Sequence, residues 1–174
     1  MRDATRPEND PILFFDRNEP YYEFTNFSYH PIINDGRTYP TAEHLFQASK
    51  FVKEYPDIAE QIRNLPTPRA ALEEATRRQR LRRHDWFDVN VKIMDAVLEK
   101  KFTQHDGLYR LLMSTGDREL IEASPVDSFW GWGENGQGRN ELGKALMRLR
   151  AKFRRQQLAY ASESRASRYA KELA

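Results

Sequence analysis

The order of helical and strand patterns along the 174 residues is the feature that most constrains the fold. Two long segments carry apolar residues at helical spacing, one beginning at Asp88 and one running from Asn140 to about Arg155. Near the N-terminus, an apolar run over residues 12–16 favours a buried strand, and an Asp35-Gly36 turn favours a hairpin. Because strands do not alternate with helices, the pattern is not that of a doubly wound sheet. We therefore predict an α+β fold, a predominantly helical single domain with a small antiparallel β-sheet near the N-terminus.

Shorter elements complete this prediction. We expect short helices over residues 42–54, 56–64, 68–78 and 108–114, and a short strand or helix edge over residues 120–123. The folded domain is expected to span residues 11–155. Residues 1–10 should form a flexible N-terminus. Residues 156–174 should be a frayed or disordered tail, because little apolar periodicity remains there.

Composition excludes several classes of function. The chain has no cysteine, which rules out a disulfide framework and thiolate catalysis. Its four histidines are scattered, so we expect no metal site, and no pattern calls for a cofactor. No apolar run approaches the roughly 18 residues of a membrane helix, and the N-terminus lacks the apolar segment of a signal peptide. The net charge of +2 is too small to indicate nucleic-acid binding by itself, so we expect a cytoplasmic protein without a membrane partner.

A helix following Tyr39-Pro40 carries the first candidate site. Thr41 is suited to cap its N-terminus. Glu43, Gln47 and Lys50 follow at i, i+4 and i+7, which places a carboxylate, an amide and an amine on one helical face. The alternative is a surface helix in which Glu43 only stabilises the N-terminus of its own helix.

A glycine-rich segment, residues 127–140, carries the second candidate site. Four glycines ahead of a helix allow backbone N–H groups to surround an anion. The segment matches GxGxxG, but no βαβ unit surrounds it, so a dinucleotide-binding site is not indicated. Two tryptophans among these glycines favour stacking on a flat ring. The alternative is a tight surface turn with Trp130 anchored in the core.

A basic run over residues 77–84, followed by Trp86, is the third candidate. Such a run is usually a solvated face, although it would also suit a phosphate. Together, the three segments indicate a phosphorylated, nucleoside-like ligand.

These segments resemble the motifs of the NADAR (YbiA-like) family. The family's S-N-F loop corresponds to Thr25-Asn26-Phe27, its helical S/T-x-E-H-x-x-Q-x-x-K-F motif to residues 41–51, and its C-terminal tryptophan-glycine motif to residues 130–150. Trp86 falls where the family has a tryptophan, and the resemblance spans roughly residues 12–154. It implies an N-glycosidase that splits the bond between a phosphoribosyl or ADP-ribosyl unit and a base-like amine.

Two departures bear on the substrate that the resemblance implies. Thr25 replaces the usual serine and keeps the hydroxyl. Trp132 stands where the family's namesake carries an acidic residue, which weakens an assignment to riboflavin-pathway ribosylaminopyrimidine phosphates. We therefore favour removal of ADP-ribose from guanine, with ADP-ribosylated nucleic acid as a possible partner.

Within this hypothesis, Glu43 is the carboxylate that moves a proton or stabilises the cationic sugar carbon. Lys50 is either a phosphate ligand or an amine that attacks the ring-opened sugar to form an imine. The remaining candidates are expected to bind substrate: Asn26, Phe27, Gln47, Arg82, Arg83, Trp86, Asp127, Trp130, Gly131, Gly133, Gly136, Gly138 and Asn140.

Two alternatives come from other classes of protein. A non-catalytic module would use the same pocket to bind ADP-ribose or a nucleotide without forming product. A nucleic-acid-binding domain would use residues 77–83 and the tail, with a steeply salt-dependent affinity.

Overall fold

Helices make up most of the fold, which confirms the predicted α+β class. The structure is a computed structural model that describes residues 10–172. Its elements follow in the order β1 (Ile12–Phe14), η1 (Tyr22–Phe24), β2 (Ile32–Asn34), β3 (Arg37–Tyr39), α1 (Ala42–Ala48), α2 (Pro56–Arg63), α3 (Pro68–Arg77), η2 (Gln79–Leu81), α4 (Trp86–Gln104), α5 (Asp106–Ser114), β4 (Leu120–Glu122) and α6 (Glu141–Glu172).

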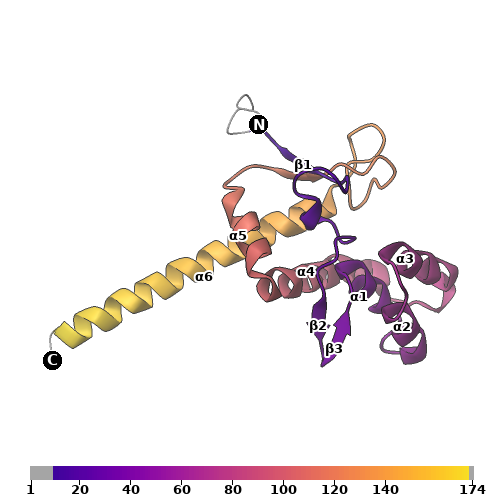
Figure 1. Ribbon diagram of the computed structural model, residues 1–174, viewed down its shortest axis with the longest axis horizontal. Helices are drawn as coiled ribbons and strands as arrows, with labels where there is room; N and C mark the ends of the chain where they lie inside the picture. The colour runs from indigo at the N-terminus through magenta and orange to yellow at the C-terminus, as the bar shows by residue number, and fades with distance from the viewer. Residues whose placement is uncertain (1–9, 173–174) are drawn as a thin grey trace.

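The core forms where α4 packs against α6 on one side and α1 on the other, and α1 also contacts α2 and α3 (Figure 1). The periodic residues of α6 are buried as the sequence predicts: Leu142, Ala145, Leu146, Leu149 and Phe153. Those of α4 are buried too, apart from Val91, which is half-buried. Amphipathic periodicity therefore identifies both long helices of the core correctly.

Two small sheets replace the single one expected. The predicted hairpin is present: β2 and β3 pair antiparallel across a turn in which Asp35 and Gly36 both have positive φ. The second sheet pairs β1 with β4 in parallel, with Ile12 opposite Leu120 and Phe14 opposite Glu122. The prediction of one sheet was incomplete because no local pattern reveals a pairing between segments so far apart in the chain. This pairing places Glu122 beside the N-terminal strand.

Two helix ends differ from the sequence prediction. Helix α1 ends at Ala48 rather than near residue 54, and the chain continues in turns up to Tyr55. Pro56 separates these turns from α2, because a proline disfavours a helical conformation at the residue before it. Helix α6 does not end near Arg155 but continues to Glu172, well beyond the body of the molecule (Figure 1). Its distal half is rich in residues of high helix propensity, which sustain a helix without an apolar face.

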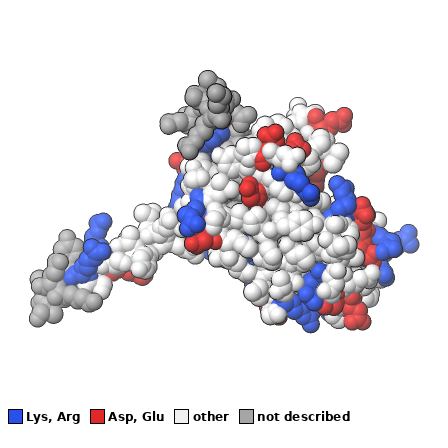
Figure 2. Space-filling view, in the orientation of Figure 1, with Lys and Arg blue, Asp and Glu red and all other residues white. Residues whose placement is uncertain are grey.

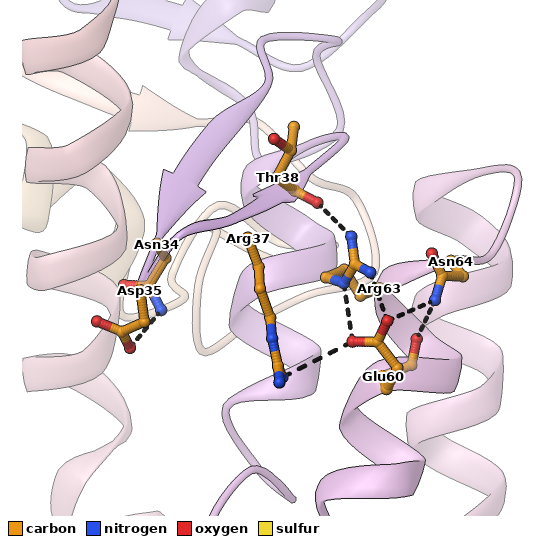
Figure 3. A network of polar contacts seen from close by, with 7 residues as sticks. All are labelled: Asn34, Asp35, Arg37, Thr38, Glu60, Arg63 and Asn64. Carbon is orange, nitrogen blue, oxygen red and sulfur yellow. Dashed lines mark hydrogen bonds and ion pairs between the residues drawn. The ribbon is translucent and has the colours of Figure 1, made fainter.

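A polar network fastens the hairpin to α2 (Figure 3). The Glu60 carboxylate accepts hydrogen bonds from Arg63 and Asn64, and Arg63 also donates to the Thr38 carbonyl of β3 at 2.9 Å. Arg37 adds an ion pair with Glu60 at 3.8 Å. The hydrogen bonds from Arg63 hold the pKa of Glu60 at about 2.

Charges of both signs are interspersed over the face in Figure 2, without a continuous field of one sign. None of the helices within residues 10–172 combines the length and the apolar character that crossing a bilayer requires.

Candidate active site

One cavity of about 400 Å³ collects most of the candidate residues. Its walls come from α1, α3, the start of α4, the loop around Asn26 and the segment from Glu122 to Trp130. Eight of the residues predicted from the sequence line it: Asn26, Phe27, Glu43, Gln47, Lys50, Trp86, Asp127 and Trp130. The fold thus brings together residues from four separate parts of the chain.

Helix α1 presents its polar face to the cavity rather than to solvent. Thr41 caps the helix as predicted, its hydroxyl accepting a hydrogen bond from the His44 backbone N–H at 3.3 Å. Gln47 Nε2 donates to Glu43 Oε1 at 2.7 Å, and both side chains are buried. Burial raises the pKa of Glu43, while the Gln47 hydrogen bond and the Lys50 charge act in the opposite direction. The interpretation of this helix as a surface helix is therefore wrong.

Lys50 lies just beyond the end of α1. Its Nζ is 5.2 Å from the centroid of the Trp86 ring and 5.8 Å from that of Phe46. Burial lowers the pKa of Lys50 to about 8, which Glu43 partly offsets and Arg82 reinforces. A substantial fraction of this lysine is consequently a neutral amine near physiological pH.

Aromatic rings form a continuous wall of the cavity. Phe46 lies between Trp86 and Trp130, with ring centroids 5.1 Å and 5.3 Å away. The Trp130 turn is held by Asp127, whose Oδ1 accepts the backbone N–H groups of Phe129 at 2.9 Å and Trp130 at 2.8 Å. Such a wall offers flat apolar surface to a ring.

The Thr25-Asn26-Phe27 loop also lines the cavity. The Asn26 carbonyl accepts the Glu43 backbone N–H at 3.0 Å, so the loop is tied to the N-terminus of α1. Three enclosed side-chain oxygens in this cavity have no hydrogen-bond partner: Asn26 Oδ1, Gln47 Oε1 and Glu122 Oε2. Buried polar atoms are nearly always satisfied, so these three indicate groups of a ligand that would bind them.

The sequence analysis missed Glu122, which lines the same cavity. Burial and the neighbouring charges of Asp127 and Glu43 raise its pKa to about 8. The position has no motif of its own, and only the parallel pairing of β4 with β1 places it here. Arg69 of α3 was also missed: it lines the cavity with its guanidinium 5.8 Å from the Phe27 ring centroid, and within residues 10–172 it has no ion-pair partner.

Five candidates from the glycine-rich segment do not line the cavity: Gly131, Gly133, Gly136, Gly138 and Asn140. The backbone N–H groups of Gly138 and Asn140 donate to carbonyls within the same segment. A Cβ on Gly131 would lie 2.8 Å from the Glu122 carbonyl oxygen, so the glycine permits close packing on β4. The side chain of Asn140 bonds both the Glu122 N–H, at 3.0 Å, and the Leu120 carbonyl, at 2.9 Å. In this structure the segment supports Glu122 and Trp130, and its role as a phosphate cradle stays a prediction.

Neither of the two predicted arginines of the basic run, Arg82 and Arg83, lines the cavity. Arg83 forms an ion pair with Asp85, and its backbone N–H donates to the Lys50 carbonyl at 2.9 Å. Arg82 stacks on Phe87, with its Cζ 4.4 Å from the ring centroid, and is close enough to lower the pKa of Lys50. Trp132 is half-buried and likewise outside the cavity lining, so its difference from an acidic residue does not remove a carboxyl from the site.

No group of three or more His, Cys, Asp and Glu side chains in the described part of the chain is arranged to hold a metal ion.

Comparison with known proteins identifies relatives of this chain. A model of the NADAR domain matches residues 13–154. N-glycosidase YbiA of Escherichia coli is 40% identical over 139 residues, covering 80% of this chain and 86% of that protein. An N-glycosidase of Nostoc punctiforme is 43% identical over 146 residues, covering 82% and 92%. A riboflavin biosynthesis protein of Vibrio vulnificus is 37% identical over 140 residues, covering 80% of this chain and 38% of that protein. The NMR structure of the Escherichia coli protein superimposes with a TM-score of 0.80 at 36% identity, over 90% of this chain and 92% of that one.

Proposed function

Because the chain belongs to the NADAR family and is an N-glycosidase, we propose that it removes ADP-ribose from guanine. The observation that carries this proposal is the meeting of Glu43 and Lys50 in one cavity walled by Phe46, Trp86 and Trp130. The rings suit a flat base, and the two polar groups suit the sugar carbon beside it.

Glu43 stabilises the sugar carbon as it becomes cationic. Breaking an N-glycosidic bond leaves positive charge on that carbon, which a nearby carboxylate stabilises, and the same carboxylate is able to accept a proton from attacking water. The hydrogen bond from Gln47 and the charge of Lys50 favour the ionised form of Glu43 against the cost of its burial.

Lys50 acts as a nucleophile in this proposal. An amine attacks a sugar aldehyde only in its neutral form, and burial supplies that form by lowering the pKa of Lys50 to about 8. A lysine that served only as a phosphate ligand would work best when fully protonated.

The cations at the cavity support a diphosphate substrate. Arg69 lines the cavity, and Arg82 is near Lys50. Two arginines suit the two phosphates of ADP-ribose better than the single phosphate of a ribosylaminopyrimidine.

A second candidate is the hydrolysis of a riboflavin-pathway ribosylaminopyrimidine phosphate. It is favoured by the similarity to the riboflavin biosynthesis protein of Vibrio vulnificus. The position of Trp132 outside the cavity also weakens the objection that the sequence raised against this substrate.

A product assay distinguishes these substrates. The purified protein is incubated separately with DNA carrying ADP-ribosylated guanine and with the ribosylaminopyrimidine phosphate, next to a Glu43→Gln variant. We expect release of ADP-ribose from the first, and a loss of at least about 100-fold in turnover in the variant, because it loses the carboxylate but not the hydrogen-bonding shape. Cleavage of the pyrimidine phosphate alone would assign the second substrate. Near-normal turnover by Glu43→Gln would exclude Glu43 from the mechanism.

A further inference from the structure

We propose that Glu122 is a second catalytic carboxyl, which donates a proton to the nitrogen that leaves the sugar. This inference rests on the proposed function in one respect only, that the cavity cleaves an N-glycosidic bond. It assigns the protonation of the leaving group to a residue in none of the sequence motifs described above.

Glu122 is held firmly at the cavity. It ends β4, where its backbone N–H donates to Asn140 Oδ1 at 3.0 Å and its carbonyl accepts the Trp132 N–H at 3.0 Å. The residue as a whole is partly exposed, but its Oε2 atom is enclosed and has no hydrogen-bond partner. A carboxyl with a fixed backbone and a free oxygen suits proton transfer to a bound molecule.

The surroundings of Glu122 and Glu43 differ in a way that separates their roles. Glu43 receives a hydrogen bond from Gln47 and faces the Lys50 ammonium, and both favour its anion. The charged groups acting on Glu122 are Asp127, from the loop after β4, and Glu43 itself, from α1. Two like charges and an enclosed oxygen favour the neutral acid, and the pKa of Glu122 rises to about 8. Burial raises the pKa of both carboxyls, and only Glu43 has groups that oppose this rise, so we assign Glu43 as the base and Glu122 as the acid.

Two further atoms indicate that a ligand reaches this place. Asn26 Oδ1 and Gln47 Oε1 are enclosed and without partners, and both residues are more than nine-tenths buried. Both line the cavity with Glu122. Hydroxyl or amino groups of a substrate would satisfy these oxygens and bring its glycosidic nitrogen within the cavity.

The proton balance of the step is simple. The bond between the sugar carbon and nitrogen breaks, its electron pair stays on the nitrogen, and that nitrogen takes the proton of Glu122. The Lys50 amine bonds to the sugar carbon and forms the imine, and water hydrolyses that imine, leaving its oxygen on the sugar carbon. The proton released as Lys50 is freed returns to the Glu122 carboxylate, directly or through Glu43. The products are a free amine and a sugar hydroxyl, with no oxidation or reduction.

The test compares the wild type with Glu122→Gln, which keeps the shape of the side chain but carries no transferable proton. Glu119→Gln is the matched control, because Glu119 is exposed and lies just before the same strand. We expect Glu122→Gln to lower kcat by at least about 100-fold and to bind ADP-ribose normally. In the wild type kcat should fall as the pH rises through about 8, and the variant should lack this fall. Near-normal kcat, or an unchanged alkaline limb in Glu122→Gln, would overturn the proposal.

A second measurement needs no turnover. Infrared difference spectra of wild type minus Glu122→Gln should contain the carbonyl band of a protonated carboxyl at pH 7, and this band should disappear above pH 8. Absence of the band at pH 7 would also overturn the proposal. A protein that shows the band but hydrolyses neither substrate would instead contradict the proposed function.

Discussion

Lys50 is the residue whose protonation state most directly connects the structure to a measurable rate. Below pH 7 it is mostly an ammonium and above pH 9 mostly a free amine, because its pKa is about 8. If the neutral amine attacks the sugar, kcat should increase as the pH rises toward this value. Because the pKa of Glu122 is also about 8, this rise and the fall assigned to Glu122 should meet in a bell-shaped profile with its maximum near pH 8. Lys50→Arg should lose this activity at every pH, since arginine keeps the charge but has no amine to form an imine.

Covalent trapping provides the complementary measurement. Borohydride added during turnover should leave a sugar adduct on the wild-type protein, located at Lys50 by mass spectrometry, and none on Lys50→Arg. A Lys50→Arg variant with full turnover and no adduct in the wild type would reassign Lys50 to phosphate binding.

At the residue scale, local spacing is enough to predict part of the site and not the rest. Glu43 and Gln47 fall on one face through helical periodicity, and their hydrogen bond is the expected i, i+4 contact. Lys50 reaches the same cavity from the turn beyond the end of α1. Glu122 depends on a parallel pairing with residues near position 12, and no spacing in the sequence encodes that partner.

At the element scale, Lys101, a fully buried lysine of α4, holds the loop of residues 23–28 in place beside Glu43. Lys101 Nζ donates to the carbonyls of Glu23 and Thr25, at 2.6 Å and 2.8 Å, and to Ser28 Oγ at 2.8 Å. These three contacts of the Lys101 amine therefore fasten the segment that presents Asn26 to the cavity.

Lys101→Met should destabilise the protein, because the apolar side chain removes three hydrogen bonds from this segment. We expect the free energy of unfolding to fall by about 2 kcal/mol in urea denaturation. Lys92→Met is the control, since Lys92 is an exposed lysine on the same helix, and it should leave stability unchanged. Equal stability of the two variants would show that the three hydrogen bonds do not stabilise the fold.

The pH dependence of this difference has a definite sign. Burial lowers the pKa of Lys101 to about 7, below its ordinary value of 10.5. Between these values the unfolded chain binds more protons than the folded one, so the contribution of Lys101 to stability rises with pH. The gap in unfolding free energy between wild type and Lys101→Met should widen from pH 7 to pH 9. A constant gap would mean that Lys101 stays charged in the folded protein across this range.

Helix ends show the limit of prediction at this scale. Apolar periodicity identifies α4 and α6 and the residues that they bury, because packing against a core imposes that period. The end of α1 at Ala48 depends on turns that pack beneath the basic segment, where Arg83 bonds the Lys50 carbonyl. Such tertiary contacts are absent from any local pattern.

At the scale of the whole molecule, the charge distribution limits the modes of binding. The face in Figure 2 mixes both signs, and Arg77 and Arg78 of the basic run pair with the buried Glu74. Affinity for unmodified DNA through this run should therefore be weak. It should be the same whether the cavity is intact or altered by substitution. An ADP-ribosylated strand is expected to bind through the modified base, so Trp86→Ala should weaken its binding while leaving that of unmodified DNA unchanged in a titration of both strands.

The distal part of α6 is the part of the fold whose contribution to stability and activity is easiest to test. Among the α6 side chains described up to Arg168, Phe153 is the last one that is buried. From Gln156 to Arg168 every side chain is exposed apart from the half-buried Ser164. A helix without packing is marginal in water, so this part should add little to the stability of the domain. A chain ending at Gln156 keeps Arg154 and its bonds to Asp117 and the Gly116 carbonyl. We expect it to unfold at the same temperature and to retain full turnover, with circular dichroism losing only the helical signal of the removed residues. A lower melting temperature or reduced turnover would mean that the distal helix belongs to the functional unit.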